Sequence, residues 1–181
     1  VITGGDTATL TPSGNGVLNN RIEKYDRIDK LYNPAVDMKG VGGRIAYNDI
    51  SNADHMAIGT HTNDVVVEYN NIHDVLRNTN DAGAVYMYIG NGPTNFTQVG
   101  NVYRYNWFHN LGAKSTIGGI DNTDNSTSRQ AFYFDGFWGT EVSSNIFTEC
   151  EYGIMVNGGW GNKVTGNAFV NTDHPICLTD N

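Results

Sequence analysis

The 181-residue chain has little proline, cysteine or positive charge, and it lacks a long hydrophobic run. Four prolines are too few for a proline-rich linker. The 11 Lys and Arg residues stand against 19 Asp and Glu residues, a formal net charge of −8. This acidic balance argues against nucleic acid or an anionic membrane surface as a partner. No apolar run approaches the roughly 20 residues of a bilayer span, so we expect no membrane association.

Asparagine and glycine are the abundant residues, with 24 Asn and 22 Gly in the chain. Both are poor helix formers, and both favour turns. The chain is nevertheless 39% hydrophobic and 11% aromatic, which is more than a disordered low-complexity chain carries. The composition therefore predicts an ordered, almost helix-free protein whose chain turns often and regularly.

A short pattern repeats along the chain: an apolar residue, an Asn three positions later, and an apolar residue two positions after the Asn. One copy is Val67-Glu68-Tyr69-Asn70-Asn71-Ile72. Successive anchor asparagines are 28, 22, 36, 39 and 22 residues apart. A basic unit of about 22 residues is too short for paired helices and favours stacked strands. We expect each anchor at a bend, where its side chain satisfies backbone groups and its backbone tolerates a left-handed conformation. The anchors are Asn20, Asn48, Asn70, Asn106, Asn145 and Asn167.

Each unit also carries a later apolar strand, such as Met56–Ile58 or Phe132–Asp135. Alternation along these strands predicts one inward row and two outward rows of side chains. This pattern is typical of an all-β parallel β-helix, here a single domain over residues 1–181 with about six coils, forming a portion of a longer solenoid. The two cysteines fall at different coil positions, so we expect free thiols. The inward row is Ile58, Val85, Phe132, Ile154 and Ile176; the outward rows are Tyr86, Tyr133, Met155 and Cys177, then Tyr88, Asp135, Asn157 and Thr179.

Insertions lengthen two adjacent coils at the same corner. The later strand begins 9 or 10 residues after the anchor in regular coils, but 15 residues after Asn70 and 26 after Asn106. The extra residues lie at 75–84 and 111–131, with a smaller excursion at 89–98. Stacked loops on a solenoid form the wall of a groove, where function concentrates.

A set of segments in consecutive coils has a recognisable order of motifs. The segments are 34–36, 40–45, 64–75, 79–86, 100–110 and 132–135. Together they resemble bacterial right-handed parallel β-helix proteins of polysaccharide utilisation, which belong to the pectate-lyase-like superfamily and include glycoside hydrolases described as α-L-fucosidases and xylanases. The resemblance covers roughly residues 34–172 and implies a right-handed solenoid, a secreted or periplasmic location and activity on carbohydrate. Relatives tend to show paired acids where this chain has Asn80-Asp81 and Asp135-Gly136.

Glycoside hydrolysis requires two carboxyl groups across the scissile bond. The candidates are Asp81, which enters one later strand, and Asp135, which projects outward one coil on. The strand spacing of about 4.8 Å and the offset along the strand allow a separation of about 5 to 9.5 Å. Aromatic rings can stack on sugar faces, and polar neighbours can bind hydroxyl groups. The candidate substrate-binding residues are His61, Tyr86, Tyr88, Tyr133, Trp138 and Asn157.

Three functions follow as hypotheses. The first is an extracellular glycoside hydrolase acting on a polysaccharide or oligosaccharide. The second is a lyase acting on uronate polymers, although the basic residues do not converge on the aromatic strand. The third is a non-catalytic carbohydrate-binding, adhesive or fibre-forming module, which could self-associate end to end through exposed coil edges. We expect no cofactor; the loop with Asp121 and Asp124 offers oxygen ligands that Ca²⁺ accepts, but lacks the spacing of an EF-hand.

Overall fold

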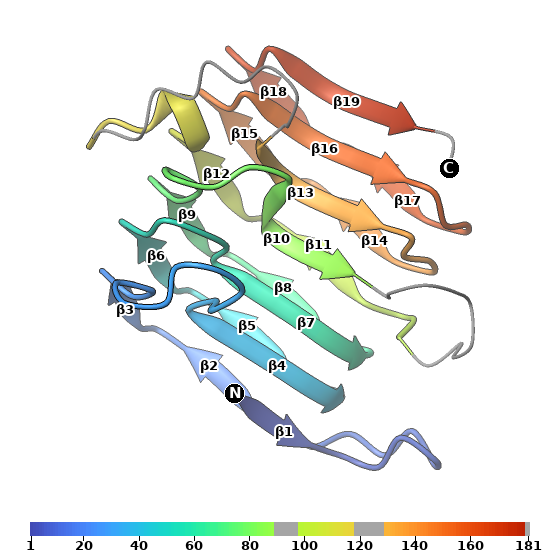
Figure 1. The fold of residues 1–181 in the computed structure, drawn as a ribbon. Helices are drawn as coiled ribbons and strands as arrows, with labels where there is room; N and C mark the ends of the chain where they lie inside the picture. The colour runs from blue at the N-terminus through green and yellow to red at the C-terminus, as the bar shows by residue number, and fades with distance from the viewer. Residues whose placement is uncertain (89–97, 118–128, 180–181) are drawn as a thin grey trace.

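The computed structural model describes residues 1–88, 98–117 and 129–179. The chain is a right-handed parallel β-helix in which three parallel sheets run the length of the solenoid, from the N-terminus at one end to the C-terminus at the other (Figure 1). Sheet 1 contains the longest strands. They are β1 (Ile2–Gly4), β4 (Val36–Val41), β7 (Ile58–Asn63), β10 (Ala82–Tyr88), β13 (Arg129–Asp135), β16 (Tyr152–Asn157) and β19 (His174–Thr179).

Sheets 2 and 3 are built from three-residue strands that lie on either side of the anchor asparagines. Sheet 2 contains β2 (Gly16–Leu18), β5 (Arg44–Ala46), β8 (Val66–Glu68), β11 (Val102–Arg104), β14 (Glu141–Ser143) and β17 (Lys163–Thr165). Sheet 3 contains β3 (Arg21–Glu23), β6 (Asp49–Ser51), β9 (Asn71–His73), β12 (Trp107–His109), β15 (Ile146–Thr148) and β18 (Ala168–Val170). One 3₁₀ turn, η1, spans Gly112–Lys114. No helix in the described part of the chain has the length and hydropathy that a bilayer span requires.

The predicted inward row of sheet 1 is confirmed. Val85 pairs with Ile58 on one side and with Phe132 on the other, and Phe132 pairs with Ile154, which pairs with Ile176. Ile58, Val85, Phe132 and Ile154 are fully buried in the core, whereas Ile176, on the last strand, is exposed. Apolar residues stack on apolar residues along this row, which is how a solenoid makes one continuous core.

The strand expected at Met56–Ile58 is wrong in its bounds, because β7 begins at Ile58 and runs to Asn63. The apolar pattern of the sequence does not predict the full length of this strand, because its later inward positions are polar. Thr60 is fully buried and shares a hydrogen bond with the hydroxyl of Tyr103, while Thr62 donates to Oδ1 of Asn101 at 3.1 Å. Hydroxyl groups that find partners inside can replace apolar residues in a core.

The asparagine ladder is present. Oδ1 of each later anchor accepts two hydrogen bonds from the anchor of the coil before it, one from the backbone N–H and one from the side-chain amide. The left-handed residue is the one before each anchor, not the anchor itself. These preceding residues, with φ between 55° and 63°, are Asn19, Tyr47, Tyr69, Tyr105, Ser144 and Gly166. Both cysteines are free, as expected.

Candidate functional site

Two rows of side chains stand on the outward face of sheet 1. The first row follows the register Asp37, Gly59, Tyr86 and Tyr133, from β4 to β13. Two positions further along, Lys39 pairs with His61, Tyr88 with Asp135, and Asp135 with Asn157, which pairs with Thr179. Parallel strands in register bring equivalent side chains together at each step of about 4.8 Å. The sheet therefore collects residues from positions 37 to 179 on one surface.

Asp135 is held by donors from the two neighbouring coils. The hydroxyl of Tyr86 donates to Oδ2 at 3.0 Å, and Nδ2 of Asn157 donates to Oδ1 at 3.0 Å. Thr179 in turn donates to Oδ1 of Asn157 at 2.7 Å, which fixes the orientation of the amide. Each carboxylate oxygen thus has one placed partner, and hydrogen bonds to an ionised carboxylate are the strong kind.

Asp81 lies at the start of β10, exposed and with a left-handed backbone (φ 50°). Its Oδ1 is 3.5 Å from the hydroxyl of Tyr133, which is 3.4 Å from Nδ2 of Asn157. Nδ2 of Asn157 is 3.0 Å from Oδ1 of Asp135. These three successive contacts place the two carboxylate oxygens within about 10 Å of each other, which is compatible with the separations found in glycosidases.

The two tyrosines between the carboxylates are stacked, with ring centroids 5.1 Å apart. Burial, with the nearby Asp135 charge as the next cause, raises the pKa of Tyr133 to about 12 and the pKa of Tyr86 still further above its usual value. Both phenols therefore remain protonated at neutral pH and act as hydrogen-bond donors. Tyr133 is only 5% exposed, so it supports the site through its hydroxyl and not as an open stacking surface.

A pocket of about 270 Å³ opens beside Tyr86. Gly59 stands between Asp37 and Tyr86 in the first outward row, and its missing side chain leaves the hollow. Loop residues from the turns before the strands form one wall. The lining residues are Tyr32, Pro34, Asp37, Lys39, Met56, Gly59, His61 and Tyr86. Tyr86 lines the pocket and also donates to Asp135, which lies outside the pocket lining. We call the outward face of sheet 1, which carries both, the groove.

A polar cluster of Asp37, Lys39 and His61 lines this pocket. Nζ of Lys39 is 3.3 Å from Oδ2 of Asp37, and Nδ1 of His61 is 3.8 Å from Oδ1. That Oδ1 is buried and has no hydrogen-bond partner among the described residues. Burial lowers the pKa of His61, so its imidazole is neutral at pH 7. His61 was expected on this face; Asp37 and Lys39 were missed, although both lie 22 residues before their partners on β7.

Other expected site residues stand elsewhere. Trp138, expected to bind substrate, is only 4% exposed, and Trp160 stacks on it at 4.7 Å between centroids. The exposed indole at this place belongs to Trp160. The side chain of Tyr88, and the candidate calcium ligands Asp121 and Asp124, lie outside the described part. Within the described part, no three His, Cys, Asp or Glu side chains gather as a metal site.

No protein-family model, curated protein or solved structure matches this chain significantly.

Proposed function

We propose that the chain is an extracellular or periplasmic glycoside hydrolase domain that binds a polysaccharide along the groove. Asp135 and Asp81 are its two carboxyl groups. The observation that carries this proposal is the placement of Asp135 by Tyr86 and Asn157, within about 10 Å of Asp81 on the same face. The resemblance of the repeat segments to β-helix proteins of polysaccharide utilisation supports the same class of substrate.

The environments of the two carboxyl groups suit different roles. Asp135 accepts one donor on each oxygen and so keeps a fixed direction, as a base or nucleophile must. Asp81 is exposed and has a single long contact at 3.5 Å, which leaves it free to reach a leaving group. In the reaction, Asp81 gives its proton to the glycosidic oxygen as the bond from that oxygen to the anomeric carbon breaks. The hydroxyl group of a water molecule bonds to the anomeric carbon, either directly, with Asp135 taking the other proton of the water, or after a covalent intermediate on Asp135, with Asp81 taking that proton.

The pocket beside Tyr86 supplies surfaces of both kinds that a saccharide needs. One wall of the pocket is apolar and is formed by Tyr32, Pro34 and Met56. Polar side-chain groups come from Lys39 and His61. Its volume of about 270 Å³ is close to the lower end of the roughly 300–1,000 Å³ of small-molecule sites. A pocket of this size suits one saccharide unit, with neighbouring units along the outward rows of sheet 1.

A lyase is the second candidate, and one observation favours it. Lys39 and His61 lie in the outward row that also contains Asp135, where they could supply a base and a charge-neutralising group. Against it, Lys39 is already paired with Asp37. A lyase leaves an unsaturated sugar that absorbs in the ultraviolet, and a hydrolase does not, so the products separate the two candidates.

The test is a polysaccharide panel with purified protein, assayed for both reducing ends and ultraviolet absorbance. The variants are Asp135→Asn, Asp81→Asn and, as control, Glu23→Gln, which removes an exposed carboxylate from sheet 3. We expect reducing ends without absorbance, unchanged activity in the control, and a loss of at least about 100-fold in Asp135→Asn. Absorbing products would favour the lyase, and binding without turnover would favour a binding module.

A further inference from the structure

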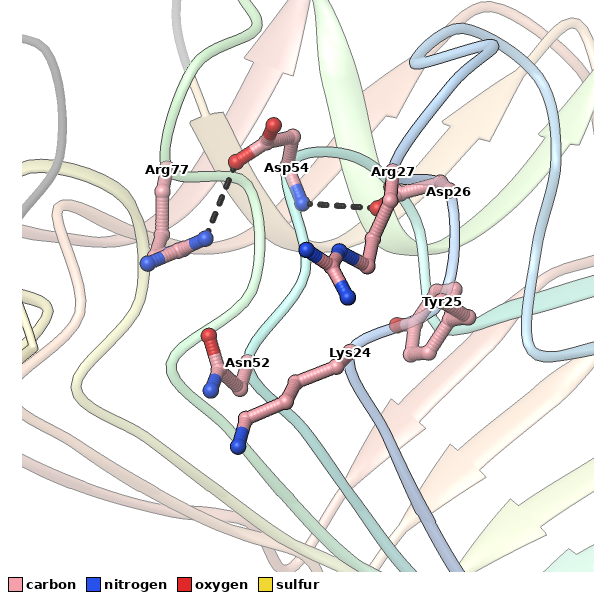
Figure 2. Close-up of a pocket in the computed structure, with 7 residues that line it drawn as sticks. All are labelled: Lys24, Tyr25, Asp26, Arg27, Asn52, Asp54 and Arg77. Carbon is pink, nitrogen blue, oxygen red and sulfur yellow. Dashed lines mark hydrogen bonds and ion pairs between the residues drawn. The ribbon is translucent and has the colours of Figure 1, made fainter.

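A second pocket, of about 340 Å³, lies where three successive coils connect sheet 3 to sheet 1. The loop after β3 contributes Lys24 to Arg27, the loop after β6 contributes Asn52 and Asp54, and the loop after β9 contributes Arg77. Figure 2 shows the ends of Lys24, Arg27 and Arg77 and the amide of Asn52 around one opening. We propose that this pocket binds a tetrahedral oxyanion, the sulfate or phosphate group of a ligand.

The pocket has more positive than negative side chains. Within the described residues, Lys24 and Arg27 form no ion pair. Asp54 is already matched twice, by Nζ of Lys30 at 2.7 Å and by Arg77 at 3.1 Å. Asp26 is occupied as a backbone acceptor, taking hydrogen bonds from the N–H groups of Asp54 at 3.2 Å and His55 at 2.8 Å. Three cations and two carboxylates thus line the pocket, and Lys30 pairs with one of these carboxylates from outside the lining, so the surplus is positive.

This surplus stands out in an acidic chain. Four of the 11 basic residues converge on one corner, although the formal net charge is −8. Like charges brought together repel each other, and a bound anion relieves that repulsion. Arg27 and Arg77 present planar forks with several N–H donors, while Lys24 adds a compact ammonium group. The hydrogen-bond donors come from three loops and so approach a ligand from several directions. A tetrahedral anion, whose oxygens point in several directions, fits such donors better than a planar carboxylate does.

The loop that forms this pocket also reaches the groove. Its later residues Tyr32 and Pro34 line the pocket beside Tyr86, and Tyr32 packs on His55 at 5.1 Å between ring centroids. One loop thus contributes residues to both pockets, and a charged substituent of a saccharide is one candidate source of the oxyanion. The free inorganic anion shares this chemistry, so the experiment must distinguish the two sources. Neither source requires that the groove be catalytic.

The first measurement is calorimetric titration of the folded chain with inorganic sulfate and inorganic phosphate, against chloride at matched ionic strength. We expect both oxyanions to bind more tightly than chloride. Arg27→Gln and Lys24→Asn should each weaken binding at least fivefold; Asn also suits the left-handed backbone of residue 24, whose φ is 57°. Higher NaCl should weaken binding further, because salt screens these charges.

Two controls separate the site from general charge. Lys163→Gln removes an exposed cation from sheet 2 in a later coil and should leave the dissociation constants unchanged. Tyr25→Phe alters a residue that lines the same pocket, but its hydroxyl is buried and has no partner among the described residues, so an anion cannot contact it. Binding and thermal stability should both survive this change. Equal weakening by Lys163→Gln, or no difference between sulfate and chloride, would overturn the proposal.

The second measurement compares a sulfated oligosaccharide with its desulfated form and with inorganic sulfate. Tighter binding of the sulfated oligosaccharide than of inorganic sulfate identifies a saccharide-borne group, and equal binding identifies a free-anion site. Asp135→Asn should bind inorganic sulfate like the wild type, so a failed hydrolase assay leaves the anion site standing. If Arg27→Gln binds all three probes as tightly as the wild type, the pocket is not the site.

Discussion

The hydroxyl of Tyr86 on β10 donates a 3.0 Å hydrogen bond to Oδ2 of Asp135 on β13, in the next coil. Its pKa is raised by burial, so the phenol stays protonated and always donates. Tyr86→Phe should lower hydrolysis about tenfold, since a hydrogen bond to a charged group contributes about 1.5–3 kcal/mol.

Tyr47→Phe is the matched control for Tyr86→Phe. Tyr47 is exposed at another corner of the solenoid, where its ring stacks on Tyr69 at 5.1 Å. The same change there should leave the rate of hydrolysis as it is. An unchanged rate in Tyr86→Phe would show that this hydrogen bond does not orient a reacting carboxylate.

The pocket depends on the missing side chain of Gly59. A Cβ at this position would be 3.8 Å from Oδ1 of Asp37 but 3.2 Å from Cγ of Pro34, so a small side chain would enter the hollow once the Pro34 ring shifts by a few tenths of an ångström. Gly59→Val should raise KM at least tenfold while Tm changes by only a few degrees. Gly16→Val on sheet 2 is the control, because its Cβ meets only ordinary contacts with Leu18. Saccharide binding that is unaffected by Gly59→Val would place the ligand elsewhere.

The asparagine ladder should dominate stability. Oδ1 of Asn70 accepts the backbone N–H and the side-chain amide of Asn48, and its own amide donates to the carbonyl of Ile45 at 3.0 Å. Asn70→Ala leaves these buried groups without partners, so we expect a loss of about 3 kcal/mol or more in the free energy of unfolding. Asn20→Ala, at the exposed first anchor, should cost less than about 1 kcal/mol. Urea denaturation of both variants measures these free energies of unfolding. Equal losses in the two variants would contradict a stabilising role of the buried ladder.

His55 should make stability depend on pH. Burial lowers the pKa of its imidazole from 6.5 to about 4. Below pH 6.5 this histidine binds a proton in the unfolded chain but stays neutral in the folded chain. Its contribution to the free energy of unfolding is therefore fully present above pH 6.5 and is lost as the pH falls toward 4. The loss is of order 2–3 kcal/mol. Denaturation of wild type and His55→Phe at pH 7.5 and pH 4.5 isolates this contribution; equal pH slopes would exclude it.

Much of the fold follows from periodicity alone. The anchors and the inward row that includes Val85 and Phe132 were predictable because stacking forces equivalent residues into register. The strand bounds of β7 were not predictable from apolar pattern, since Thr60 and Thr62 are buried through hydrogen bonds. The left-handed residue before each anchor was also missed, because Tyr69 and Tyr105 are not residues that favour that backbone.

The candidate site was only partly predictable. The alternation of residues along the strands predicts that Asp135 and Asn157 lie side by side, and the strand register agrees. The alternation could not predict that Trp160 covers Trp138, because that contact depends on the conformation of the turns after the strands. Asp37 and Lys39 were missed because the apolar pattern identified only one strand beside theirs. The 22-residue spacing from these two residues to their partners on β7 is the signal that could have found them.

The central claim is that Asp135 in the groove acts on a bound polysaccharide. The most direct measurement determines binding and turnover of the same oligosaccharide for wild type and Asp135→Asn. Asn keeps the shape of the side chain but cannot act as a base or nucleophile. We predict a dissociation constant within about threefold of wild type and a kcat lower by at least about 100-fold. Equal kcat values in the two proteins would contradict the account.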